Sequence, residues 1–314
     1  MIEEIHILAF YKYVNIENPE RFMKDHLNFC LELGIRGRIL VGKEGINGSV
    51  SGTLEQTEKY KEYLLVDLRF QGMMFKEDVG LLHPFEKMQI KVKEEVVHFG
   101  VDVDLKYTGT HLQPSEFLEI YDEQGKLKDN ILLLDARNDY EYNVGRFKDS
   151  VHLDIKNFRD FPEAAKQQLV NKKDKKVVMF CTGGIRCEKA SAYLKQELGF
   201  QDVAQIDGGI ANFGKQFPDT VWEGSLFVFD KRLVVPINQK DQRAITECVG
   251  CGKECDLYKN CRNAYCDKLY ITCIDCEHAM NGCCSDNCLE EFRKQCLEKS
   301  ADRQGRKTKE VGEE

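Results

Sequence analysis

The chain has 314 residues and a formal net charge of -8 at pH 7. This acidic balance excludes binding of nucleic acid through an overall basic surface, so an RNA partner must meet a local basic patch, and DNA is not expected as a partner. No uncharged apolar run approaches the ~18 residues of a membrane helix, and the first residues lack the basic start and apolar core of a signal peptide. We therefore expect no membrane partner and a cytoplasmic location.

The first segment, residues 1–105, carries the signals of a small α+β domain. Asn18, Pro19 and Gly34 mark the two ends of one helix, and Thr53 with Gln56 forms a capping box at the start of another. The order βαββαβ predicts a ferredoxin-like fold. Its expected strands are 5–14, 38–41, 48–51 and 88–93, its helices are 18–33 and 53–66, and a glycine-rich turn covers 42–48.

A basic patch is predicted near this glycine-rich turn. Four cations could converge there on RNA phosphates, with the aromatic residues Phe10, Tyr11 and Tyr13 beside them. The alternative interpretation is a hairpin whose charged side chains are exposed to water and bind no ligand. The four predicted RNA-binding residues are Lys12, Arg36, Arg38 and Lys43.

The second segment, residues 106–225, is predicted to be an α/β domain with a parallel sheet. Its short apolar runs are typical of strands buried on both faces. Residues 109–113 are expected to be a connector, followed by a helix from Pro114. The expected strands are 131–135, 151–154, 176–180 and 203–207, and one helix ends at Gly199.

A cysteine follows the strand 176–180 and precedes a helix. Backbone N–H groups and the positive end of a helix dipole meet at such a turn, so the thiol of Cys181 should lose its proton easily. Gly183 and Gly184 permit a tight turn, and Arg186 adds a permanent positive charge. The loop Cys181, Thr182, Gly183, Gly184, Ile185 and Arg186 is thus the candidate active site. Cys187 is a possible resolving thiol or a packing residue.

Three ordered motifs of this segment resemble a rhodanese domain. They are Asp135-Ala136-Arg137 with Tyr140-Glu141-Tyr142 and Gly145, the loop Cys181–Arg186, and Asp207-Gly208-Gly209. Arg146 and Asp149 depart from the usual His and Gly of the family's GHIPGA pattern. The resemblance implies a persulfide-forming Cys181, with Asp135, Arg137 and Glu141 bracing the fold. Four residues separate Cys181 from Arg186, where rhodanese-like phosphatases have five, and the smaller ring favours sulfur chemistry.

The third segment, residues 226–298, is a hairpin linker over 226–235, turning at 230–232, followed by most of the chain's 14 cysteines. In a reducing cytoplasm such a cluster indicates a metal site. Two pairs have zinc-ribbon spacing, and two further pairs complete two tetrahedral sites, with Cys283 as an alternative to Cys284. An iron–sulfur cluster or a thiol store are the other interpretations. The predicted zinc ligands are Cys248, Cys251, Cys261, Cys266, Cys273, Cys276, Cys284 and Cys288. Residues 299–314 are expected to be a disordered charged tail.

Taken from residue 7 to residue 290, the chain resembles the bacterial rhodanese-containing tRNA uridine hydroxylases. The resemblance is carried by 10–13, 44–48, 178–190, 227–232 and 282–285. It implies oxygen-dependent formation of 5-hydroxyuridine at the wobble position, with the tRNA anticodon region as partner, O2 as co-substrate and Cys181 as the essential residue.

Two other functions remain open from the residues. One is a sulfurtransferase that carries a persulfide, and the other is a non-enzymatic RNA-binding zinc protein. For the hydroxylase, the hypothesis is that Cys181 adds to a flipped uracil ring beside C5, while Arg186 and the loop amides hold the developing charge.

Overall fold

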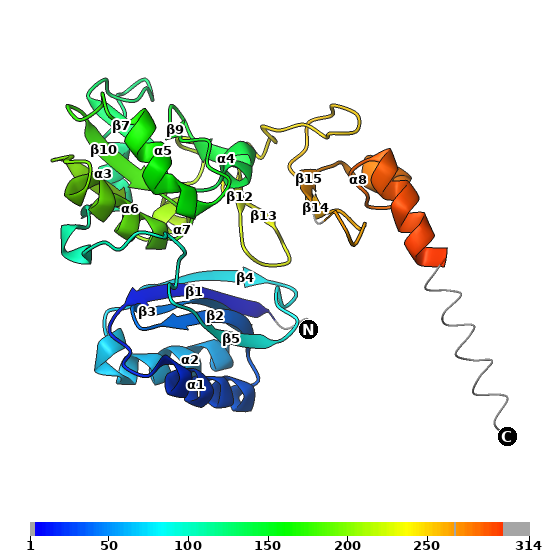
Figure 1. Ribbon diagram of the computed structural model, residues 1–314, viewed down its shortest axis with the longest axis horizontal. Coiled ribbons are helices and arrows are strands. Elements are labelled where there is room, and N and C mark those ends of the chain that lie inside the picture. Colours follow the sequence, from blue (N-terminus) through cyan, green and yellow to red (C-terminus); the bar gives the residue numbers. More distant parts are fainter. Residues whose placement is uncertain (1–3, 267, 298–314) are drawn as a thin grey trace. The chain divides into compact units, whose positions relative to one another are not determined.

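The computed structural model describes residues 4–266 and 268–297 and has a mixed α/β fold (Figure 1). Its contacts divide it into two compact units, Met1–Asp241 and Gln242–Glu314. The first unit contains two five-stranded sheets and one three-stranded sheet. One apolar core belongs to the N-terminal domain and two belong to the middle domain. The predicted fold class is confirmed. The predicted tail 299–314 lies outside the described residues.

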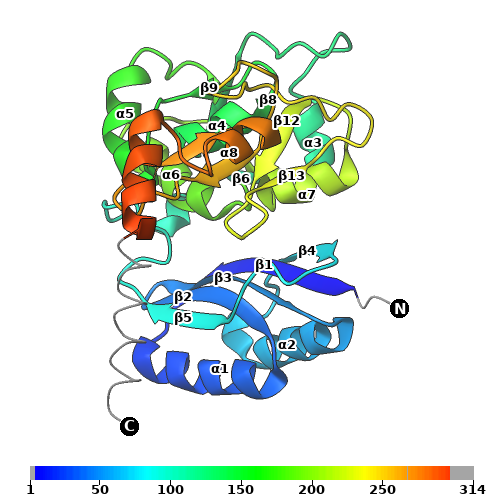
Figure 2. The same cartoon turned by 90° about the vertical axis from the view of Figure 1, so that its right-hand side faces the viewer.

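The N-terminal domain is one five-stranded sheet with two helices on one face (Figure 2). The order β4-β1-β3-β2-β5 keeps the ferredoxin-like arrangement in its first four strands. Its strands are β1 (Ile5–Tyr13), β2 (Arg36–Gly42), β3 (Gly45–Gly52), β4 (Phe75–Gly80) and β5 (Met88–Val92), and its helices are α1 (Pro19–Leu33), α2 (Leu54–Val66) and the short η1 (Leu68–Phe70).

The helix ends follow the local sequence signals. The Asn18 side chain accepts a hydrogen bond from the Arg21 N–H, and Gly34 ends α1 in the left-handed conformation. Thr53 and Gln56 form the predicted capping box of α2. These caps satisfy backbone groups that a helix leaves unpaired, so both helix positions are confirmed.

Two predictions for this domain are wrong. The strand over 88–93 is not the fourth strand of the ferredoxin-like unit, because β4 (Phe75–Gly80) fills that place and β5 adds a parallel edge beside β2. The glycine-rich turn is also shorter than predicted. Gly42 pairs directly with Gly45, so residues 46–48 belong to β3.

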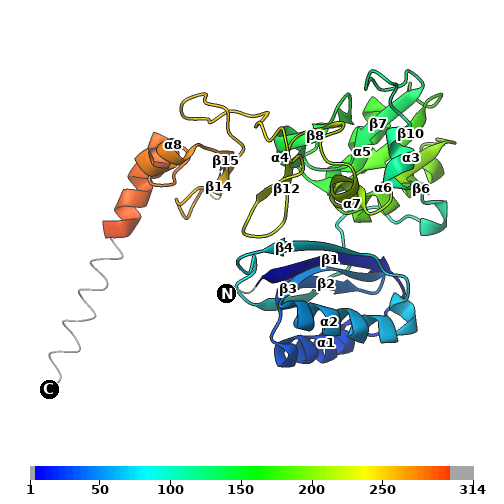
Figure 3. The same cartoon turned by 180° about the vertical axis from the view of Figure 1, so that it is seen from behind.

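The middle domain has a parallel sheet flanked by helices (Figure 3). The strand order β6-β11-β10-β7-β9 puts β10 at the centre, buried on both faces. Before and within this domain lie η2 (Leu105–Tyr107), β6 (Thr110–Leu112), α3 (Pro114–Leu118), β7 (Ile131–Asp135), α4 (Asp139–Val144), β8 (Gly145–Phe147), β9 (Val151–His152), η3 (Phe158–Asp160), α5 (Phe161–Gln168), β10 (Lys176–Phe180), α6 (Ile185–Gln196), β11 (Val203–Ile206), α7 (Gly209–Gln216), β12 (Trp222–Phe227) and β13 (Val234–Pro236).

Three details of the middle domain differ from the prediction. The connector over 109–113 contains the edge strand β6, which pairs with β11. The strand at Val151 ends after His152, because Asp154 adopts a positive φ of 53°. The hairpin after residue 222 is formed by β12 and β13, and β12 also pairs with β8, so this hairpin packs as part of the middle domain.

The second unit is small and rich in cysteine. It contains the antiparallel pair β14 (Tyr258–Asn260) and β15 (Leu269–Ile271), followed by α8 (Ile274–Ala279). Its apolar core is a small group around Tyr270 and Leu289 with several cysteines. In the described part of the chain, no helix has the length and apolar character needed to cross a membrane.

Candidate active site

Cys181 follows β10 directly, at the carboxyl end of the central strand, where parallel sheets hold their ligands. The loop turns back at Gly184, whose φ of +100° is a conformation that glycine tolerates best. This turn directs the Gly184 N–H to the Cys181 Sγ at 3.1 Å. The carbonyls of Cys181 and Thr182 accept hydrogen bonds from Ile210 and Ala211 on α7, so both sides of the loop are held.

The environment of the Cys181 sulfur favours its thiolate. Burial by itself would raise the pKa, but the Cys187 thiol, the Arg186 charge and the backbone N–H groups of residues 186 and 187 outweigh burial and lower the pKa to about 5. The pKa of the Cys187 thiol changes in the opposite direction: burial and the hydrogen bond to Cys181 raise it. Cys187 is therefore a thiol that donates to the Cys181 thiolate, and both are free.

Arg186 forms a buried ion pair with Glu141 of α4. Its Nη1 and Nη2 donate to the two carboxylate oxygens of Glu141 at 2.6 Å and 2.7 Å, and Thr182 donates to the same carboxylate at 3.1 Å. The guanidinium also lies over the Phe229 ring, 5.7 Å from its centroid. The Glu141 charge thus compensates most of the Arg186 charge, and the pair holds the loop in shape.

Residues of the N-terminal domain contact the same loop and the first turns of α6, the helix that follows it. The Tyr11 hydroxyl donates to Glu188 Oε1 at 2.8 Å, and the Tyr13 hydroxyl donates to the Ile185 carbonyl at 3.4 Å. Lys189 pairs with Glu44 and Glu95 at 2.8 Å each. Cys181 itself is fully buried. A base that reacts with this sulfur must therefore displace part of the cover.

Glu188 is the centre of a polar network beside the loop. Besides Tyr11, it is bound by Thr108 at 2.7 Å and His111 at 2.9 Å. The carboxylate raises the pKa of His111, and these partners lower that of Glu188 against the effect of burial. Sequence reasoning missed this network, because its members lie far apart in the chain and share no motif.

Asp135 and Arg137 form a second buried pair. Arg137 Nη2 lies 2.6 Å from Asp135 Oδ2 and 2.6 Å from the Gly145 carbonyl oxygen. Both side chains have no exposed surface. The pair joins the end of β7 to the start of β8.

The four predicted RNA-binding cations do not converge. Arg36 and Arg38 are exposed, and the strand register places them on the sheet face of Tyr11 and Tyr13. Lys12 lies on the opposite face, and Lys43 lies at the far end of β2 from Arg36. Phe10 is buried in the core and is not available for stacking on a base. RNA contacts of Lys12, Arg36, Arg38 and Lys43 stay a prediction.

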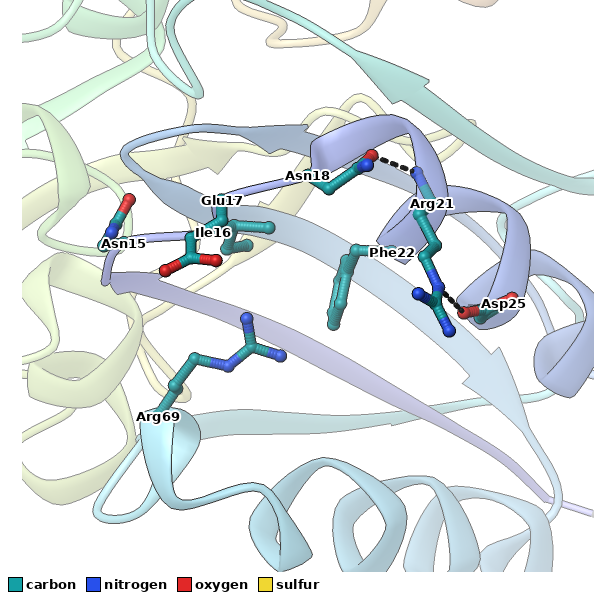
Figure 4. Close-up of a pocket in the computed structure, with 8 residues that line it drawn as sticks. All are labelled: Asn15, Ile16, Glu17, Asn18, Arg21, Phe22, Asp25 and Arg69. Atoms are coloured by element: carbon teal, nitrogen blue, oxygen red, sulfur yellow. Dashed lines mark hydrogen bonds and ion pairs between the residues drawn. The ribbon is translucent and has the colours of Figure 1, made fainter.

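A hollow lies at the start of α1, lined by residues of the N-terminal domain (Figure 4). Two guanidinium groups lie on its walls. Arg21 pairs with Asp25 and Arg69 pairs with Asp67, so both positive charges are compensated. This hollow therefore offers no strong anion site.

The eight predicted metal ligands form two groups in the C-terminal unit. Cys248, Cys251, Cys273 and Cys276 form one group, and Cys261, Cys266, Cys284 and Cys288 form the other. Within each, the four sulfurs lie within 4.8 Å of one another, so the groups can bind metal ions. Cys283 is instead buried in the unit's core.

Comparison with known families agrees with this architecture. Residues 5–96 match the UPF0176 acylphosphatase-like domain, residues 113–216 match the rhodanese-like domain, and residues 223–289 match the rhodanese C-terminal region. A parallel sheet with a cysteine loop at the end of its central strand defines the middle domain as a rhodanese-like domain.

The chain belongs to the tRNA uridine(34) hydroxylase family. It is 43% identical to the protein of that name from Listeria welshimeri over 292 residues, which cover 91% of this chain and 90% of the relative. It is 42% identical to the Bacillus licheniformis protein of the same name, with 92% and 89% covered. The Staphylococcus saprophyticus protein is 43% identical, with 93% and 92% covered.

Proposed function

We propose that this protein hydroxylates the wobble uridine of tRNA to 5-hydroxyuridine, with Cys181 as the nucleophile and O2 as the oxidant. The observation that carries the proposal is a thiolate-forming cysteine at the turn from a buried strand to a helix, in a chain that is similar to tRNA uridine(34) hydroxylases over most of its length. Because tRNA is the substrate, we expect the protein to act in the cytoplasm.

The proposed first step is addition of the Cys181 thiolate to the uracil ring at C6, next to C5. The new S–C6 bond places electron density on C5 and O4, which prepares C5 for reaction with oxygen. The Gly184 N–H points at the sulfur, at 3.1 Å, and so favours the charged form of the nucleophile. The base must leave its stack in the anticodon loop to reach the buried sulfur.

The proposed RNA surface is the part of the N-terminal sheet where the exposed side chains of Arg36 and Arg38 project from β2. These two cations share that face with Tyr11 and Tyr13, which contact the cysteine loop. Phosphates bound there would place the tRNA beside the active site. Lys12 and Lys43 do not lie on this patch, so any RNA contact of theirs would be separate from it.

Zinc is the proposed occupant of the two cysteine groups. Three sulfur pairs, Cys251–Cys273, Cys266–Cys284 and Cys284–Cys288, lie 3.7 Å, 3.7 Å and 3.8 Å apart. Four thiolates around one ion with bonds of about 2.3 Å are separated by about 3.8 Å at tetrahedral angles. A multi-iron cluster would spread its ligands farther apart, so the spacing supports a single ion at each site.

The test is the nucleoside composition of tRNA from cells that lack the endogenous enzyme and express this chain. The wild-type chain should restore 5-hydroxyuridine, the Cys181→Ser variant should not, and the matched Cys296→Ser variant, at an exposed cysteine, should behave as wild type. Normal 5-hydroxyuridine with Cys181→Ser would refute the assignment. Thiocyanate formation from thiosulfate and cyanide without any change in tRNA would support the sulfurtransferase instead.

A further inference from the structure

A second cation lies at the active site, and it comes from the N-terminal domain. Lys76 belongs to β4, the edge strand that pairs with β1, and its register partner is Ala9, on the sheet face of Tyr11. The Lys76 Nζ lies 4.4 Å from the centroid of the Tyr11 ring. The Lys76 side chain is buried, with 8% of its surface exposed.

Tyr11 connects this ammonium group to the nucleophile. A Cβ on Gly184 would lie only 2.9 Å from the Tyr11 hydroxyl, so the ring rests against the loop turn. The N–H of that same Gly184 donates to the Cys181 Sγ. The neighbouring Met74 reaches the loop after β11, where its Sδ would be 2.8 Å from a Cβ on Gly208. The segment that enters β4 therefore forms part of the cover over Cys181.

The two cations of the site differ in how their charge is compensated. Arg186 is bound through two hydrogen bonds to Glu141, so little of its charge is available to a substrate. In the described part of the chain, the Lys76 ammonium has no carboxylate within ion-pair distance. A buried cation that lacks an ion-paired carboxylate is unfavourable for stability, and such groups cluster at functional sites.

We propose that Lys76 is a catalytic residue, which binds the O4 oxygen of the target uracil and neutralises the negative charge that forms there. This inference rests on the proposed function, because it assigns the partner of the charge produced by Cys181. When the thiolate pair forms the S–C6 bond, the C5=C6 pair moves to C4–C5 and the C4=O4 pair moves to O4. Lys76 then donates a hydrogen bond or its proton to that oxygen. No other reactant enters this step.

The titration of Lys76 is consistent with such a role. Burial lowers its pKa to about 8, against the opposing charges of Cys181, Asp207 and Glu188. The groups that face it are Tyr11 on β1, Cys181 after β10, Glu188 on α6 and Asp207 after β11. A lysine with a pKa near the working pH can both donate and recover a proton.

The experiment compares Lys76→Met and Lys76→Arg with wild type, and uses Lys59→Met at an exposed position of α2 as the matched control. The purified full-length chain acts on an unmodified tRNA transcript in aerated buffer, and both the single-turnover rate of 5-hydroxyuridine formation and the tRNA dissociation constant are measured. Lys76→Met should lose about 100-fold or more in rate, with tRNA binding within about threefold of wild type. Lys76→Arg should keep most of the rate, and Lys59→Met all of it.

The pH profile provides a readout that a purely structural lysine would not change. The wild-type rate should fall above pH 8 as Lys76 loses its proton, and Lys76→Arg should lack this fall because an arginine stays charged. A Lys76→Met rate within about threefold of wild type, or a loss confined to tRNA binding, would overturn the inference. If wild type itself forms no 5-hydroxyuridine, the proposed function fails, which is a separate result.

Discussion

The Tyr11 hydroxyl lies 2.8 Å from Glu188 Oε1, and this hydrogen bond joins the first strand of the N-terminal sheet to the helix that starts at the cysteine loop. Tyr11 is largely buried, and burial together with the Glu188 charge raises its pKa, so it remains a donor. The N-terminal domain therefore supplies part of the wall around the Cys181 loop, in addition to the RNA surface that we propose for it.

Removal of the hydrogen bond between Tyr11 and Glu188 should make the first unit less stable. Tyr11→Phe leaves the buried Glu188 carboxylate with one donor fewer, which we expect to lower the free energy of unfolding by about 1–3 kcal/mol. Tyr63→Phe, at a half-exposed ring stacked on Phe29, is the matched control and should have little effect. Urea unfolding curves measure both. If Tyr11→Phe is as stable as Tyr63→Phe, the hydrogen bond between Tyr11 and Glu188 does not stabilise the protein.

Glu141→Gln should destabilise the loop strongly, because it leaves the buried Arg186 charge without its counter-ion. We expect a loss of about 3–5 kcal/mol in the free energy of unfolding. The double variant Glu141→Gln/Arg186→Met should recover much of that loss, since it removes the uncompensated charge. Glu197→Gln, at an exposed position, is the control. Thermal and urea unfolding of wild type and the three variants measure these differences. The prediction fails if the double variant is the least stable of the four proteins.

Gly184→Ala should be far more disruptive than Gly183→Ala. Gly184 has a φ of +100°, and an added Cβ would meet the Tyr11 hydroxyl at 2.9 Å, whereas a Cβ at Gly183 meets nothing within 4 Å. The expected cost of the left-handed conformation alone is about 1–3 kcal/mol at position 184. Calorimetry of the two variants gives the comparison. Similar melting temperatures would mean that the turn differs from the one described.

The dependence of the rate on pH should follow the Cys181 thiolate on its acid side. The folded-state pKa is lowered to about 5, so the reactive thiolate is present above pH 5 and is lost as the pH falls through that value. The single-turnover rate should therefore be flat between pH 6 and pH 7 and should fall about tenfold per unit well below pH 5. A rate that still rises tenfold per unit from pH 6 to pH 8 would indicate a thiol with an ordinary pKa.

Metal content should report the two cysteine groups in the C-terminal unit. Pairs of cysteines from the two groups alternate along the chain. A metal ion in the first group would therefore link two segments that flank a pair of ligands of the second group. We expect about two zinc ions per chain by mass spectrometry, no more than one in Cys248→Ser, and two in the control Cys255→Ser, whose sulfur lies outside both groups. Wild-type protein without zinc, purified in the absence of chelators, would refute the proposal.

Short-range signals in the sequence predicted the elements that depend on neighbouring residues. The caps at Asn18 and Thr53 and the cysteine loop after β10 all act over a few positions, so their structure follows from local hydrogen bonding. Strand β4 was missed because Phe75–Gly80 contains three charged residues and no apolar alternation. As an edge strand that pairs only with β1, it needs little apolar character.

The sequence by itself determined the fold class and the place of Cys181 between a strand and a helix, and it predicted the cysteines that could bind metal, with Cys283 and Cys284 left as alternatives. The structure places Cys284 in the second cysteine group. The sequence could not determine which groups surround the thiol, because Tyr11, Lys76 and Glu141 reach the loop from elements far away in the chain. Only the tertiary structure decided that Glu141 compensates the charge of Arg186. It also decided that, among the residues described, no carboxylate forms an ion pair with Lys76. The loop remains the proposed reactive centre, and the charges around it depend on packing between residues that no local pattern connects.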